Sequence, residues 1–258
     1  MNNKLTICQN WLPRYTGMPI DSFADYILLT NFQNYVDVFA EKLNVEVNGM
    51  GKAMPNATCH KSNISIINFG MGSANAATIM DLLIARQPKA VLFLGKCGGL
   101  KKSTDIGHFV LPIAAIRGEG TSNDYFPSEV PALPSFKLHK FVSEKIVARN
   151  FEYRTGVIYT TNRRVWEHDE EFKQRLLNMK CIGIDMETAT VFIVGHHNEI
   201  VRGALLLVSD VPLTPDGVKT EKSDKFVTEN WVNTHLEIGI ESLRGLEAYG
   251  ETIKHFTY

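Results

Sequence analysis

The chain has 258 residues, of which 44% are hydrophobic and 21% charged, so it can bury the core of one large domain, although two domains remain possible. Its net charge of −1 provides no bulk field to hold a polyanion, and neither nucleic acid nor a membrane surface is an expected partner. Residues 1–16 contain no apolar signal segment, and no apolar run approaches the roughly 20 residues of a membrane helix, so we expect a cytoplasmic protein.

Apolar runs alternate with helical patterns along the chain, which favours a single α/β domain over residues 1–258 with a central mixed sheet. The expected strands are 26–30, 64–69, 90–94, 108–117 and 156–161, followed by the runs that end near 185 and 208. The expected helices are 32–43, 73–87, 136–149, 170–179, 187–197 and 223–249. The least regular segment, 118–134, is expected to be an ordered surface loop near a site or an interface.

The cysteines give no sign of a metal site or of disulfide bonds. All four lie far apart and none forms a CxxC pair, so we expect reduced thiols, no metal and no cofactor. These cysteines are Cys8, Cys59, Cys97 and Cys181.

Two acidic residues lie where expected buried strands end. Asp210 follows the apolar run 204–208, and Glu187 follows Ile184-Asp185-Met186. An acid carried out of a core to the end of a strand, where loops open in α/β proteins, must hold a partner or take part in chemistry. The alternatives are a helix cap for Asp210 and a first-turn glutamate favoured by the helix dipole for Glu187.

Two glycine clusters also follow expected strands, Gly70-Met71-Gly72-Ser73 and Gly95-Lys96-Cys97-Gly98-Gly99. Such turns let a ligand approach the backbone closely, although a plain tight turn remains an alternative. Neither cluster has the spacing of a dinucleotide-binding motif or a P-loop. A lysine between strand-end glycines is poorly placed as a solvated charge, so Lys96 is a candidate ligand residue.

The segments 70–72, 95–100, 185–189 and 208–210, in this order along the chain, resemble motifs of the nucleoside phosphorylase superfamily. The resemblance implies an α/β fold whose mixed sheet tends towards a distorted barrel flanked by helices, with the site at the strand ends. It further implies that Glu187, with Met186, binds the ribose hydroxyls and that Asp210 protonates or hydrogen-bonds N7 of a purine leaving group. An acid that relieves charge on the leaving base lowers the barrier to ribosyl cleavage.

The chain departs from the phosphorolytic members where they bind phosphate. Their two phosphate-binding arginines fall at Asn34 and Phe93 here, and their serine falls at Lys96. Losing two guanidinium groups removes the bidentate clamp that holds free phosphate best. Water is therefore the expected nucleophile.

Among hydrolytic members, the segments 10–17, 27–32, 94–100 and 185–190 are most similar to the catalytic domain of the AMP nucleosidase family. That resemblance implies hydrolysis of AMP to adenine and ribose 5-phosphate, and a homohexamer built as a trimer of dimers. We expect no counterpart of the N-terminal regulatory domain found in longer members. The alternatives are a purine nucleoside phosphorylase or methylthioadenosine-type nucleosidase acting on an unphosphorylated nucleoside, and a nucleotide sensor without turnover.

A nucleotide substrate needs cations around its 5′-phosphate. Arg14 is a candidate that would act across a subunit interface, and Trp166 is a candidate to pack on adenine or, alternatively, a core aromatic. The other 5′-phosphate candidates are Asn31, Lys96, Arg117 and Arg164, with Arg163 a weaker one. The expected substrate-binding residues are Met71, Lys96, Cys97, Gly98, Trp166 and Met186.

Overall fold

The computed structural model describes residues 3–215 and 217–249, which form one mixed sheet of nine strands in the order β2-β3-β4-β1-β5-β8-β7-β6-β9. The strands are β1 Tyr26–Thr30, β2 Val47–Asn48, β3 Asn56–Cys59, β4 Ile64–Asn68, β5 Ala90–Gly99, β6 Phe109–Gly118, β7 Tyr153–Thr161, β8 Gly183–Asp185 and β9 Arg202–Asp210.

Five of these strands close into a barrel, because β5 pairs with β8 on one side and with β9 on the other. The remaining strands extend the sheet outward from β1, which lies parallel to both β4 and β5. Every residue of β1, β5 and β9 is buried, as expected for strands covered on both faces. The predicted α/β fold with a mixed sheet and distorted barrel is confirmed.

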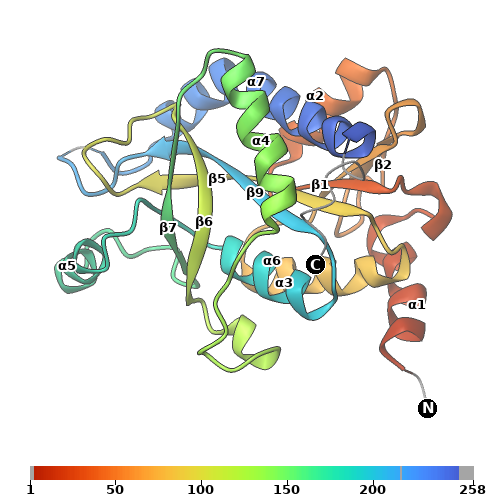
Figure 1. Cartoon of the computed structure of the whole chain (residues 1–258), viewed down its shortest axis with the longest axis horizontal. Helices are drawn as coiled ribbons and strands as arrows, with labels where there is room; N and C mark the ends of the chain where they lie inside the picture. The colour runs from red at the N-terminus through yellow and green to blue at the C-terminus, as the bar shows by residue number, and fades with distance from the viewer. Residues whose placement is uncertain (1–2, 216, 250–258) are drawn as a thin grey trace.

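Helices cover both faces of the sheet (Figure 1). On one face α2, α4 and α7 pack over a core that includes Phe39, Leu138 and Leu236. On the other face α1, α3 and α6 enclose a second core around Leu12, Met80 and Phe192. The helices are α1 Lys4–Thr16, α2 Gln33–Leu43, α3 Ser73–Leu82, α4 Phe136–Ala148, α5 Glu170–Asn178, α6 Thr188–His197 and α7 Glu221–Tyr249. No helix in these described segments is both long and apolar enough to cross a bilayer.

Four elements differ from the sequence-based expectation. The helix α1 was not expected; the Asn3 side chain accepts from the Thr6 amide at its start, and Gly17 ends it in a left-handed conformation. The short antiparallel strands β2 and β3 at the sheet edge were also not expected. The cluster 95–99 continues β5 instead of following it, because β8 and β9 supply hydrogen-bonding partners from distant parts of the chain.

Candidate active site

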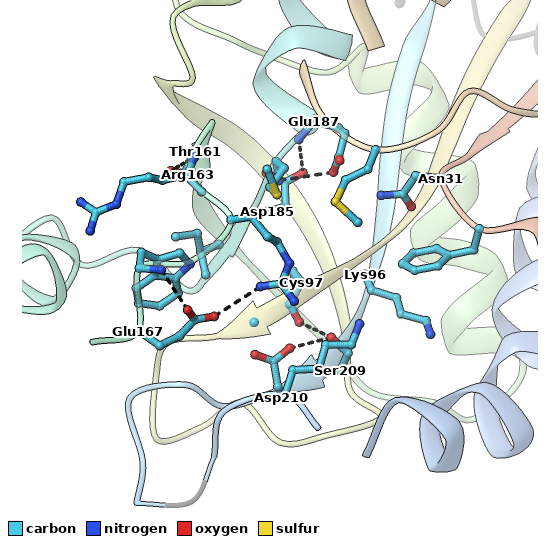
Figure 2. A pocket seen from close by; sticks show the side chains of 18 residues that line it. Asn31, Lys96, Cys97, Thr161, Arg163, Glu167, Asp185, Glu187, Ser209 and Asp210 are labelled. Carbon is cyan, nitrogen blue, oxygen red and sulfur yellow. Dashed lines mark hydrogen bonds and ion pairs between the residues drawn. The ribbon is translucent and has the colours of Figure 1, made fainter. Parts of the chain in front are cut away.

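The ends of the barrel strands open into a cleft of about 650 Å³, a volume that includes its open mouth (Figure 2). This is the edge of an α/β sheet at which ligands usually bind. Its lining includes Asn31 after β1, Met71 after β4, residues 96–98 of β5, Thr161 at the end of β7, residues 184–187 around the end of β8, and Ser209 and Asp210 at the end of β9.

Glu187 lies at the junction of β8 and α6 and is 2% exposed. Its Oε1 accepts a hydrogen bond from the Gly72 amide at 2.7 Å, and its Oε2 accepts from the Met186 amide at 3.3 Å. Gly72 has a φ of +95°, a conformation that glycine adopts without strain, and this directs its amide at the carboxylate. The carboxylate thus bonds to the glycine cluster rather than to the amides of its own helix.

The neighbouring acid, Asp185, is fully occupied by donors. Its Oδ1 accepts from the Thr160 hydroxyl at 2.7 Å, and its Oδ2 accepts from the Thr188 hydroxyl at 2.6 Å and the Thr188 amide at 2.7 Å. The Glu187 amide donates to the same Oδ2 at 3.2 Å. Asp185 therefore caps α6 and joins β7 and β8 to it at the base of the cleft.

These two acids compete for ionisation. Burial, followed by the nearby Asp185 carboxylate, raises the pKa of Glu187 to about 8. Burial also raises the pKa of Asp185, but its four donors favour the charged form. We assign the shared proton to Glu187. Its role as a carboxylate therefore depends on a ligand that donates hydrogen bonds or brings positive charge.

Asp210 ends β9 and faces Gly98 of β5. It is 8% exposed, and its Oδ1 accepts from the Ser209 hydroxyl at 2.7 Å. Burial raises the pKa of Asp210, and the Ser209 hydrogen bond opposes that rise in part. A raised pKa makes this carboxyl better suited than an ordinary aspartate to carry a proton, as a general acid must.

Four cations line the cleft, and each is paired with an acid. Lys96 lies 2.9 Å from Asp224, and Lys219 lies 2.8 Å from the same carboxylate. The other two pairs are Arg163 with Asp169 at 2.8 Å and Arg164 with Glu167 at 3.4 Å. Lys96 is the only buried member of the four, with a side chain 3% exposed, whereas the arginines are about half exposed.

The remaining predicted substrate-binding residues lie in the lining, although their contacts with a nucleoside stay a prediction. Trp166 is 4% exposed and packs edge-on against Phe172 at 5.5 Å between ring centroids, so its ring also belongs to a small core. Burial raises the pKa of the Cys97 thiol well above its ordinary value, which keeps it protonated and unreactive. The other members are Met71, Gly98 and Met186.

Two of the predicted phosphate residues, Arg117 and Arg14, lie outside the cleft lining. Arg117 lies outside the cleft lining, and its guanidinium donates to carbonyl and side-chain oxygens of the loop 118–134. The loop folds back over the end of β6 and uses up these donors, so Arg117 stabilises the loop. Arg14 is exposed on α1, outside the lining, and its action across an interface stays a prediction.

Two residues of the ion pairs in the cleft, Lys219 and Asp224, were not predicted from the sequence. They lie before and within the first turn of α7, which approaches the barrel from the C-terminal part of the chain. The charge-dense segment 219–225 was the available signal. Among the residues with described positions, no group of three or more His, Cys, Asp or Glu side chains is placed to hold a metal ion.

Comparison with known proteins places this chain in a family. Residues 25–244 match the phosphorylase superfamily. A curated AMP nucleosidase of Escherichia coli (strain K12) is 29% identical over 94% of this chain, and the chain spans 59% of that relative's length.

Solved structures agree with that placement. The crystal structure of an AMP nucleosidase from Bacteroides thetaiotaomicron is 50% identical, covers 96% of this chain and 100% of its own, and superposes with a TM-score of 0.86. A uridine phosphorylase from Vibrio fischeri shares the fold at 22% identity, with 87% and 93% of the two chains covered and a TM-score of 0.76. The chain belongs to the phosphorylase superfamily and, within it, to the family of the AMP nucleosidases.

Proposed function

We propose that this chain hydrolyses the N-glycosidic bond of AMP and releases adenine and ribose 5-phosphate. One observation carries the proposal: a single cleft brings Glu187 and Asp210 together with four cationic side chains. The two acids fit ribosyl cleavage, and the cations fit a substrate that carries a phosphate. The names of the relatives support the same substrate.

Asp210 is assigned to the purine. As the bond between C1′ and N9 breaks, its electron pair moves into the base, and a proton delivered to N7 makes adenine a better leaving group. The raised pKa of Asp210 favours the protonated form, and Ser209 holds the carboxyl in place through its hydroxyl.

Glu187 is assigned to the ribose. The 2′ and 3′ hydroxyls donate hydrogen bonds to the carboxylate, and the developing oxocarbenium charge on the sugar favours its ionised form. Substrate binding thereby lowers a pKa that burial and Asp185 have raised. The charge on Glu187 is then available when positive charge develops on the sugar, which stabilises the transition state more than the ground state.

The 5′-phosphate is assigned first to Arg164, with Arg163 beside it. Both guanidinium groups line the cleft, are about half exposed and each holds one carboxylate. Exposed ion pairs of this kind contribute little stability, so either arginine can exchange its acid for a phosphate at small cost. Lys96 is a poorer candidate because Asp224 and Thr228 already bind its ammonium group.

The test is adenine release from AMP in buffer without phosphate. We expect adenine and ribose 5-phosphate in equal amounts and no ribose 1,5-bisphosphate, because water attacks C1′. No adenine after hours at micromolar enzyme would overturn the proposal and favour a nucleotide-binding protein without turnover.

A further inference from the structure

Two lysines from different parts of the chain share one carboxylate at the edge of the cleft. The ammonium groups of Lys96 and Lys219 approach the same atom, Oδ1 of Asp224, at 2.9 and 2.8 Å. Both also lie over the Phe32 ring, at 4.5 and 5.6 Å from its centroid. This group of two cations and one anion retains one net positive charge.

The surroundings give the group the properties of an anion site that already contains its anion. The Lys96 side chain is 3% exposed, and the Thr228 hydroxyl lies 3.0 Å from its ammonium group. Both lysines line the cleft that holds Glu187 and Asp210, whereas Asp224 reaches them from the first turn of α7. Two ammonium groups with a hydroxyl nearby form a set of donors that suits a tetrahedral oxyanion.

We propose that the Asp224 carboxylate is a built-in anion that keeps inorganic phosphate away from Lys96 and Lys219, and that replacing it converts these two lysines into a phosphate site. The binding part of this proposal stands on the geometry alone. Its consequence for AMP cleavage rests on the proposed function. Asp224 is then a specificity-determining residue, because it lets the chain bind a nucleotide while free phosphate is present.

The physical reason is charge balance. Without the carboxylate, Lys96 would be left as a buried cation without its ionic partner, beside a second cation. Phosphate restores the balance, whereas in the unmodified chain the same phosphate would meet a carboxylate of like charge, a contact that costs affinity.

The experiment is a calorimetric titration of inorganic phosphate at pH 7 into the unmodified chain, Asp224→Asn and Glu221→Gln. The Glu221 variant is the matched control, since it removes one exposed acid from the same helical turn. We expect phosphate to bind Asp224→Asn at least about tenfold more tightly than the other two, because a repulsive carboxylate is gone. Adding Lys219→Met to Asp224→Asn is expected to abolish the gain.

Equal phosphate affinity in all three proteins would overturn the proposal, and so would a gain that survives Lys219→Met. Asp224→Ser serves as a second variant if the asparagine variant does not fold. Because the titration contains no AMP, it succeeds or fails independently of the proposed function. A phosphate-dependent rise in KM for AMP in Asp224→Asn alone extends the result to the reaction.

Discussion

The floor of the cleft and its rim hold their charges in opposite ways. On the floor, buried Asp185 and Glu187 accept hydrogen bonds from backbone amides and threonine hydroxyls that several elements fix in position. On the rim, Arg163 and Arg164 pair with acidic side chains and remain about half exposed. The floor is preorganised for one chemistry, whereas the rim can exchange partners to recognise a phosphate.

The largest effect is expected on the floor, from Glu187→Gln. The amide retains an acceptor for Gly72 but loses the charge that stabilises the sugar, so kcat should fall by roughly 10³-fold. Steady-state adenine release measures this. A loss below tenfold would show that Glu187 is not the group that stabilises the ribosyl cation.

Glu187→Gln should also be more stable than the unmodified chain, and the difference in stability should grow as pH rises. Glu187 has an ordinary pKa of 4.5 and a folded-state value of about 8, so the folded state binds its proton more tightly. Its ionisation therefore lowers stability as pH rises through that window. Thermal melts should show a Tm advantage for Glu187→Gln that grows from pH 5 to pH 8. A constant difference would contradict the raised pKa.

Asp210→Asn tests the second acid of the cleft, at the end of β9. The amide cannot deliver a proton to N7, so kcat should fall by roughly 10²-fold or more, the scale of general acid catalysis. Ser209 can still donate to the amide oxygen, so the fold and KM should change little. Near-normal turnover would refute the role of Asp210.

A smaller and selective effect is expected at the rim. Arg164→Ala should raise KM for AMP by roughly tenfold while leaving cleavage of adenosine unchanged, because only AMP carries the phosphate. Arg175→Ala, which removes an exposed arginine of α5 outside the cleft, is the control. Equal effects of Arg164→Ala on both substrates would remove Arg164 from the phosphate site.

The smallest effect on the reaction is expected at Arg117. Its donors hold the loop 118–134, so Arg117→Ala should lower the free energy of unfolding by about 2 kcal/mol and leave KM for AMP unchanged. Chemical denaturation and steady-state kinetics measure the two quantities. A raised KM with unchanged stability would support Arg117 as a phosphate ligand.

What the sequence predicted correctly depended on short-range patterns. Apolar runs marked the buried strands, and Glu187 and Asp210 stood out because each follows one of them. The cleft brings both together because β8 and β9 pair with the two sides of β5 close to Gly98.

What the sequence did not predict depended on contacts between distant segments. The barrel was expected from the family resemblance and not from local patterns, because its closure needs pairing between β5 and β9. The acidic partner of Lys96 lies on the distant helix α7. Arg117 stood at a strand end like the true lining residues, but its loop folds back onto it. A position at the end of a strand therefore predicted that a residue lies near the cleft, but it did not predict whether its side chain points into the cleft.

Hydrolysis of AMP in this cleft is tested by comparing adenine release from AMP, adenosine and methylthioadenosine, each with and without phosphate. We expect AMP to be cleaved with the highest kcat/KM and phosphate not to be required. Equal or faster cleavage of adenosine, or a strict requirement for phosphate, would contradict the assignment of this cleft to AMP hydrolysis.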